Sequence, residues 1–147
     1  MGFFNVLDIS AAGMEVQQAR LAVAASNMAN ARTTRAADGG TYQPMQVVVT
    51  SRQGEVSSGV VTQSGGVVAL PMPVVSTVTA AEASPQLVYD PGHPDADERG
   101  FVRLPGMDPI TSMMDLVSIS RGYEANLRAF DVTRTLLQRT LDMWRGR

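Results

Sequence analysis

The side chains best suited to chemistry are concentrated in one short segment, residues 89–100. Four carboxylates and the only histidine fall within nine residues there: Asp90, His93, Asp95, Asp97 and Glu98. Carboxylates bind hard cations, and histidine together with Asp or Glu binds zinc. The spacing does not match a calcium-binding loop, because the glycine and the terminal glutamate of such a loop are misplaced.

The same segment contains three residues that break regular structure, Pro91, Gly92 and Pro94. They favour a rigid, tightly turned linker whose side chains accept hydrogen bonds from backbone N–H groups. We prefer this interpretation to a metal site and predict neither a metal nor another cofactor. Four side chains are expected to set the shape of this loop or to contact another subunit: Asp90, His93, Asp95 and Asp97.

The sequence contains few of the residues and motifs that enzymes use for catalysis. The chain has no cysteine, and all twelve basic residues are arginine, which excludes thiolate and lysine chemistry. It has no G-x-S-x-G, no H-E-x-x-H and no glycine-rich phosphate loop. A Ser–His–Asp set could use His93, but almost any chain offers a Ser and an Asp. We predict that the protein is not an enzyme and has no catalytic residues.

Composition and charge exclude further classes of protein. The 147 residues suit one domain, and a net charge of −2 gives no electrostatic case for nucleic acid. No apolar run reaches the 18 residues or so that a membrane helix needs. The first residues lack the basic and apolar regions of a secretory signal, so we expect export, if any, without a cleaved signal peptide.

Proline and glycine divide the chain into three zones. All eight prolines lie between residues 44 and 109, and nine of the thirteen glycines lie between residues 39 and 106. This shift predicts an N-terminal helical region at 1–34, a central insert at 35–107 that includes the 89–100 loop, and a C-terminal helical region at 108–147.

The N-terminal zone follows the 3,4 spacing of a helix that lies along another helix. Asn5 is the expected N-cap, with Phe4 packing on Ile9, and Asn30 is the expected stop. The predicted seam consists of Phe4, Leu7, Ala11, Met14, Gln18, Leu21, Ala25 and Met28.

The C-terminal zone repeats the pattern. Asp108 followed by Pro109 is a strong helix start, and Glu124 and Arg128 form an i,i+4 pair on a solvated face. The predicted seam consists of Met113, Leu116, Ser120, Tyr123, Leu127, Phe130, Arg134, Leu137, Leu141 and Trp144.

Valine and threonine cluster in short runs in the central zone, which predicts a small β element with no large sheet. The polar, glycine-rich stretch 51–66 is expected to be a mobile loop or a hairpin tip. The fold class is therefore mainly α: long N- and C-terminal helices packed antiparallel as a coiled coil, with a small β-rich or extended insert.

Both helices also carry apolar residues off the seam, such as Val16, Val23, Val117 and Val132. One partner helix cannot cover two faces. The β insert could fold back over them, but we favour burial by neighbouring subunits. Asn27 lies inside an apolar helix, where an amide is costly, and we expect it to fix register by bonding to a neighbouring backbone.

Residues 26–31, which read S-N-M-A-N-A, resemble the S-N-I-A-N-A signature of the flagellar rod and hook (axial) protein family. Residues 113–117, 120–126 and 136–141 resemble the C-terminal helix of the same family. The segment 89–102 is similar to a signature of one small rod member. Departures are Met28 in place of Ile, Arg32 in place of Asn and Gly122 in place of Ser.

The resemblance implies a structural subunit of the proximal rod of the flagellar basal body, which polymerises through its terminal helices into a tube that crosses the periplasm and transmits torque. It implies self-association, contacts with the rod proteins FlgB, FlgF and FlgG and the adaptor FliE, and delivery by the flagellar type III export apparatus. The alternative that the heptads permit is a non-polymerising coiled-coil adaptor or secretion-associated regulator. The residues expected to pack between subunits are Leu7, Met14, Leu21, Asn27, Met28, Asn30, Met113, Leu116, Tyr123, Asn126, Leu127, Phe130, Leu137 and Leu141.

Overall fold

The computed structural model describes residues 2–36, 39–53, 60–61, 67–68 and 71–146. Two long helices, α1 (Gly2–Ala29) and α2 (Pro109–Arg145), flank the β insert. The strands in these ranges are β1 (Met45–Gln53), β2 (Val60–Val61), β3 (Val67–Val68), β4 (Pro71–Ala80), β5 (Gln86–Tyr89) and β6 (Phe101–Leu104). The fold is mainly α with a small β insert, as the sequence predicts.

Helix α2 begins as expected. The Asp108 carboxylate accepts hydrogen bonds from the backbone N–H groups of Ile110 and Thr111, and Pro109 occupies the first turn, where its missing N–H costs nothing. The Thr111 hydroxyl also donates to Asp108, at 2.7 Å. This hydroxyl and the two N–H groups hold the pKa of Asp108 below its ordinary value.

The predicted start of α1 is wrong. The helix begins at Gly2, so Asn5 lies inside it and is 9% exposed, and the expected packing of Phe4 on Ile9 loses its basis. No breaker stands between Gly2 and Asn5, so the helix can continue to its first residues. The predicted end is confirmed: α1 stops at Ala29, and the Asn30 amide donates back to the Ser26 carbonyl oxygen at 2.9 Å.

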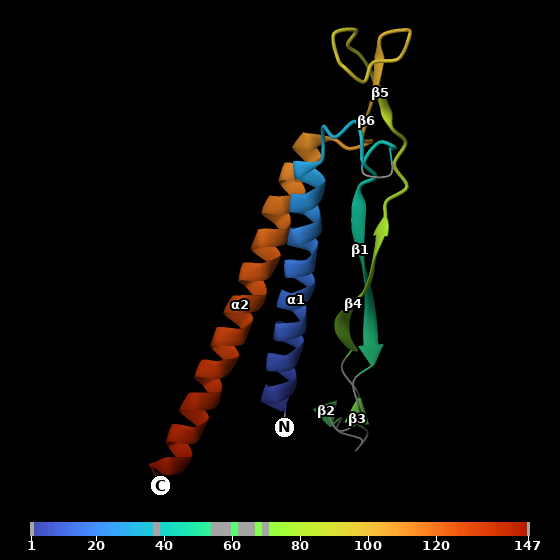
Figure 1. Ribbon diagram of the computed structural model, residues 1–147. Coiled ribbons are helices and arrows are strands. Elements are labelled where there is room, and N and C mark those ends of the chain that lie inside the picture. Colours follow the sequence, from blue (N-terminus) through green and yellow to red (C-terminus); the bar gives the residue numbers. More distant parts are fainter. Residues whose placement is uncertain (1, 37–38, 54–59, 62–66, 69–70, 147) are drawn as a thin grey trace.

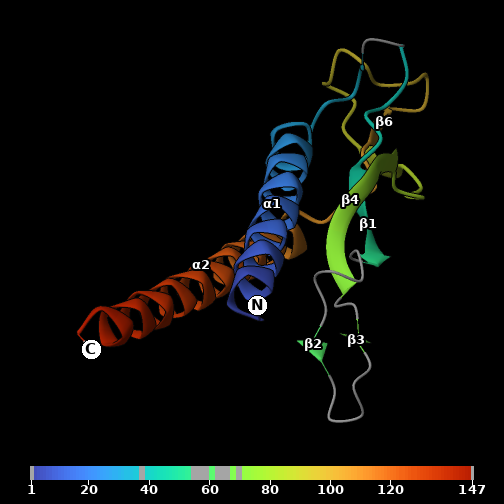
Figure 2. The ribbon, with the colours of Figure 1, turned by 90° about the horizontal axis from the view of Figure 1, so that it is seen from below.

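The two helices run antiparallel and pack along each other (Figure 1). Two glycines show their register: a Cβ on Gly13 would lie 2.9 Å from the Asn126 amide nitrogen, and one on Gly122 would lie 3.1 Å from the Gln17 amide nitrogen. Continued along α1, this register brings its first residue level with Leu137. The rest of α2 extends beyond α1, as both views show (Figure 1, Figure 2).

The face that α2 turns toward α1 is rotated from the predicted seam. Thr133 is buried and Asn126 is half-buried, whereas the predicted seam members Ser120 and Arg134 are exposed. With this rotation Gly122 and Asn126 face α1, where a Cβ on Gly13 or Gly122 would lie about 3 Å from the Asn126 or Gln17 side chain.

A long β-hairpin lies along α1 on the side away from α2, so α1 is the middle layer (Figure 1, Figure 2). Its strands β1 and β4 pair antiparallel from Met45 opposite Ala80 to Gln53 opposite Pro71, with a bulge at Val48 and Val49. In the described ranges every sheet has two strands, which fits the expectation of no large sheet. Most of the predicted mobile stretch lies outside the described residues, although β1 extends through its first part to Gln53.

Little of this chain forms a core. Among the described residues, the buried hydrophobic side chains are Val16 and Val102, and Pro105 is also fully buried. Large apolar side chains are exposed along both helices. No helix within these ranges has the length and apolar character needed to cross a membrane.

Candidate assembly site

The 89–100 segment joins β5 to β6 as a tightly turned loop. At its base, the rings of Tyr89 and Phe101 pack edge to face with centroids 5.4 Å apart. Gly100 closes the turn with a φ of +79°, and a Cβ there would lie 3.0 Å from the Tyr89 ring and 3.1 Å from Pro91. Only glycine satisfies both the backbone conformation and the space at this position.

Side chains inside the loop accept hydrogen bonds from its backbone. Asp97 Oδ1 accepts from the N–H groups of Arg99 and Phe101, at 2.9 and 2.8 Å. Asp90 Oδ1 accepts from the Gly92 N–H at 3.3 Å. His93 Nδ1 accepts from the Asp95 N–H at 3.1 Å. Over the ranges that the structure describes, no three His, Cys, Asp or Glu side chains are placed to hold a metal ion.

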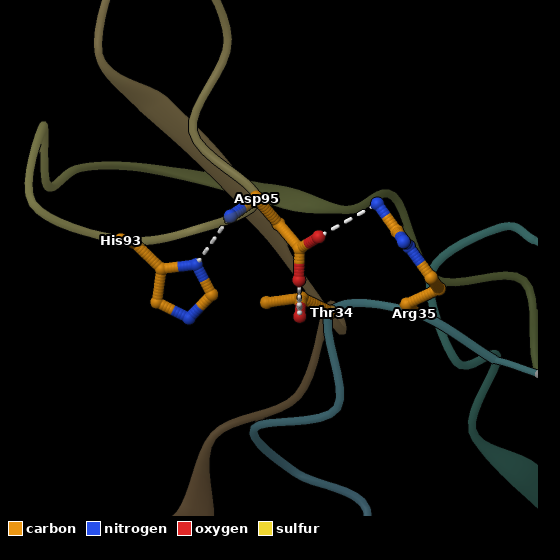
Figure 3. Close-up of polar contacts among 4 residues, drawn as sticks. All are labelled: Thr34, Arg35, His93 and Asp95. Carbon is orange, nitrogen blue, oxygen red and sulfur yellow. Dashed lines mark hydrogen bonds and ion pairs between the residues drawn. The ribbon is translucent and has the colours of Figure 1, made fainter.

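Asp95 connects this loop to the chain that follows α1. Its Oδ2 accepts from the Thr34 hydroxyl at 2.8 Å, and its Oδ1 lies 2.8 Å from Nη2 of Arg35 (Figure 3). The Asp95 side chain is 26% exposed and that of Arg35 is 74% exposed, so the ion pair is partly solvated. These residues, together with Arg103, line a polar cavity of about 320 Å³. Thr34 and Arg35 lie 61 and 60 positions from Asp95, and no sequence signal indicated the contact.

Asn27 joins α1 to the β-hairpin. Its amide nitrogen donates to the Met45 carbonyl oxygen at 2.7 Å, and its amide oxygen accepts from the Met45 N–H at 2.8 Å. The Tyr42 hydroxyl also donates to Asn27 Oδ1, at 3.0 Å. The backbone that the amide contacts here belongs to the same chain. The cost of an amide inside an apolar helix pointed to Asn27, but nothing in the sequence pointed to Met45 or Tyr42.

The side chains expected to pack between subunits divide into two groups in the isolated chain. Those that are half-buried are Leu7, Met14, Asn27, Met28, Asn30, Leu116, Asn126, Phe130 and Leu137. Those that are exposed are Leu21, Met113, Tyr123, Leu127 and Leu141. The exposed group leaves apolar surface on both helices that no described part of the chain covers.

Comparisons with a family model and with individual proteins both identify flagellar basal-body rod proteins as similar to this chain. Residues 98–143 match the family described as flagellar basal body rod FlgEFG protein C-terminal. The chain is 36% identical to the flagellar basal-body rod protein FlgC of Aquifex aeolicus over 147 residues, which covers 99% of each chain. It is 38% identical to the same-named protein of Bacillus subtilis, over 97% of this chain and 99% of the relative. It is 36% identical to that of Salmonella typhimurium, over 97% and 98% respectively.

Proposed function

Because this chain belongs to the FlgC family of flagellar basal-body rod proteins, and is therefore a structural component of the rod, not an enzyme, we propose that it polymerises through its two terminal helices. In the assembled rod, these helices pack with those of neighbouring subunits as coiled coils and form the wall of a helical tube. The tube crosses the periplasm and transmits torque from the motor.

The observation that carries this proposal is the imbalance between a very small core and an extensive apolar helix surface. Ile110, Met114 and Val132 are each at least 60% exposed, whereas the buried hydrophobic side chains among the described residues are two valines. Apolar surface of this extent marks an interaction site. Burial of both helices among neighbours would remove it from water and would distribute load over many contacts.

Such a small core also supports a mechanism of assembly. We expect the terminal helices of the free subunit to fray, because the intramolecular contacts alone bury little apolar surface. Docking would then order them, as in coupled folding and binding. We propose export without a cleaved signal peptide by the flagellar type III apparatus, and contacts with FlgB, FlgF, FlgG and FliE, on the basis of family membership.

A charge placed within the helix surface tests polymerisation. Leu21→Asp or Leu137→Asp should abolish rod assembly, because each would bury an unpaired carboxylate between helices. Gln138→Asp is the matched control, since it adds the same charge at an exposed neighbour of Leu137. Quantitative mass spectrometry of detergent-resistant hook–basal bodies measures the outcome. Normal motility and incorporation of both leucine variants would refute packing through these helices.

The 89–100 loop is proposed to act as a preformed contact, with its shape set by Asp90, His93, Asp95 and Asp97. The hydrogen bonds of these residues within the loop and to Thr34 support a single rigid shape. Replacement of residues 91–99 by a short Gly-Ser linker should reduce swimming while the protein remains exported. Swimming at the wild-type rate would reject a contact role for the loop.

A further inference from the structure

An apolar stripe runs along the first two turns of α2, on a side that no described part of the chain covers. Ile110, Met113, Met114 and Val117 follow one another at the i, i+3, i+4, i+7 spacing of a single helix face. They are 70%, 58%, 68% and 54% exposed. A hollow of about 370 Å³ is lined by the last three of them and by Arg121. The stripe therefore ends at a positive charge.

One side of α1 carries small residues in a matching order. Ala22, Ala25 and Ala29 share a helix face and are exposed, so neither α2 nor the β-hairpin covers them. Glu15 lies on the same face, two turns before Ala22, and is exposed as well. In the ranges that the structure describes, neither Glu15 nor Arg121 takes part in an ion pair. This side of α1 is therefore low in side-chain bulk near its end and negative before it.

The two surfaces lie at the same height on the helix pair. The antiparallel register of α1 and α2, continued toward the end of α1, places Ile110 level with Ala29, Met114 level with Ala25, and Val117 level with Ala22. Arg121 is then within one helical turn of the level of Glu15, a distance that a long arginine side chain spans. Both surfaces are exposed, so they do not cover each other within one chain.

We propose that the apolar stripe of α2 packs on the alanine face of α1 in a second copy of the chain. The neighbouring α1 lies beside α2 in the same antiparallel direction and register as the α1 of its own chain. Methionine side chains are unbranched and adaptable, so Met113 and Met114 spread over the alanines. Arg121 pairs with Glu15 of the second copy, and the polar end of the contact fixes its register.

Three observations favour a second copy as the occupant. Large apolar side chains of α2 are level with alanines of α1 at three successive positions, and the charges that end the two surfaces have opposite signs. The contact also repeats an antiparallel pairing of α1 with α2 that the chain already makes. Because the two surfaces differ, the contact is heterologous, and each copy binds one neighbour on either side. This inference rests on the proposed polymerisation and specifies which helix faces meet.

Disulfide crosslinking tests the contact, because the chain has no cysteine of its own. Met114→Cys and Ala25→Cys are combined in the full chain, and purified hook–basal bodies are oxidised and analysed by non-reducing electrophoresis and mass spectrometry. The expected result is a disulfide between position 114 of one copy and position 25 of another. Met114→Cys with Asp8→Cys is the matched control and should give no such product. Asp8 lies on the same exposed side of α1, but 17 residues from Ala25, or about 26 Å at roughly 1.5 Å per residue.

A photoreactive probe identifies the occupant directly. p-Benzoylphenylalanine replaces Ile110, at the end of the stripe, and its adducts in irradiated hook–basal bodies are mapped by mass spectrometry. Adducts on α1 of another copy, at residues 22–29, are expected. Adducts on a different rod protein alone would overturn the contact and leave the proposed function standing, as would entry of the double-cysteine chain into the rod without a disulfide between copies. If the unmodified chain is not recovered in the rod, polymerisation is refuted and this contact with it.

Charge exchange supplies an independent readout. Arg121→Glu should lower the yield of the chain in hook–basal bodies about threefold or more, because it places two carboxylates together at the contact. Addition of Glu15→Arg in the same chain should restore most of the yield. Failure of Glu15→Arg to rescue a folded, exported Arg121→Glu chain overturns the contact.

Discussion

The side-chain amide of Asn27 forms both hydrogen bonds of the Met45 backbone, as a neighbouring β-strand would do. The two N···O distances are 2.7 and 2.8 Å, and they join the last turn of α1 to the first residue of β1. The Asn27 side chain thus takes the hydrogen-bonding place of a paired strand residue, at the point on α1 where the β-hairpin begins. These two bonds are one of the connections that place the insert relative to α1, beside the packing of β1 and β4 along the helix and the bonds of Asp95.

Asn27→Ala should detach the start of the hairpin. The change removes the two bonds to Met45 and the bond from the Tyr42 hydroxyl, and we expect a loss of about 1–2 kcal/mol of local stability. The Met45 amide should then exchange with solvent roughly 5 to 30 times faster. Tyr42→Phe removes one of the three bonds and is the matched control, with a smaller effect. Unchanged exchange at Met45 in Asn27→Ala would show that packing alone holds the hairpin.

Gly13→Ala and Gly122→Ala should have opposite effects on the helix pair. Alanine in a helix interior is favoured over glycine by about 1 kcal/mol. At Gly122 the new methyl group meets the far end of Gln17, which can move, so Gly122→Ala should stabilise the pair. At Gly13 it would lie about 3 Å from the whole amide group of Asn126, so Gly13→Ala should destabilise the pair by about 1–3 kcal/mol.

Urea denaturation followed by circular dichroism measures these differences. Asn126→Ala added to Gly13→Ala should recover most of the loss, because it removes the clashing group. Equal effects of alanine at the two glycines would mean that the Asn126 amide does not resist a methyl group at Gly13 more than Gln17 does at Gly122.

Asp95→Ala should release the 89–100 loop from the chain after α1. It removes the bonds to Thr34 and Arg35, and because the ion pair is partly solvated we expect only about 0.5–1.5 kcal/mol. Asp95→Asn retains a side-chain acceptor for the Thr34 hydroxyl and should lose less. Amide exchange should rise in residues 90–100 and stay unchanged in α2. A uniform rise across the whole chain would instead indicate global destabilisation.

Acid should fray the first turn of α2. The Thr111 hydroxyl and two N–H groups lower the pKa of Asp108 from 3.8, so its folded value lies below its unfolded value. Such a group stabilises the fold at pH above the unfolded value, and this stabilisation disappears as the pH falls from about 3.8 through the folded value. Exchange at Ile110 and Thr111 should therefore rise in that window. Asp108→Asn retains an acceptor that does not titrate, and identical pH profiles for the two chains would contradict the assignment.

The ends of helices were predictable where they depend on hydrogen bonds between residues close together in the sequence. Asp108 and Pro109 identify a helix start through neighbouring atoms, and Asn30 identifies a helix end in the same way. Asn5 has the right type for a cap but lies one turn inside α1, since cap residues are also tolerated within helices. Heptad spacing predicted two paired helices, but it did not predict their rotation, in which Gly13 faces Asn126 and Gly122 faces Gln17. Such contacts arise only when both helices are placed together.

The polar contacts were predictable only in part. Asp90 and Asp97 bond within a few residues of themselves, which turn-forming chemistry indicates. Asp95 and Asn27 bond to partners 61 and 18 positions away. The choice of these partners depends on how distant segments are placed in space, which residue types alone do not predict. The expectation for the apolar residues off the seam holds only on α2, where Val117 and Val132 are exposed. On α1, Val16 is buried and Val23 is half-buried within the same chain.

Because α1 and α2 run antiparallel, Gly2 and Arg145 lie at one end of the helix pair and the 89–100 loop lies beyond the other end (Figure 1). Each subunit therefore has a direction, because its two ends, or tips, consist of different residues. A small epitope fused to either terminus and one inserted at Gly92 would mark opposite tips. With the helices aligned along the rod, antibody-gold labelling of the two tags in electron micrographs of isolated basal bodies would give the direction in which the subunits point.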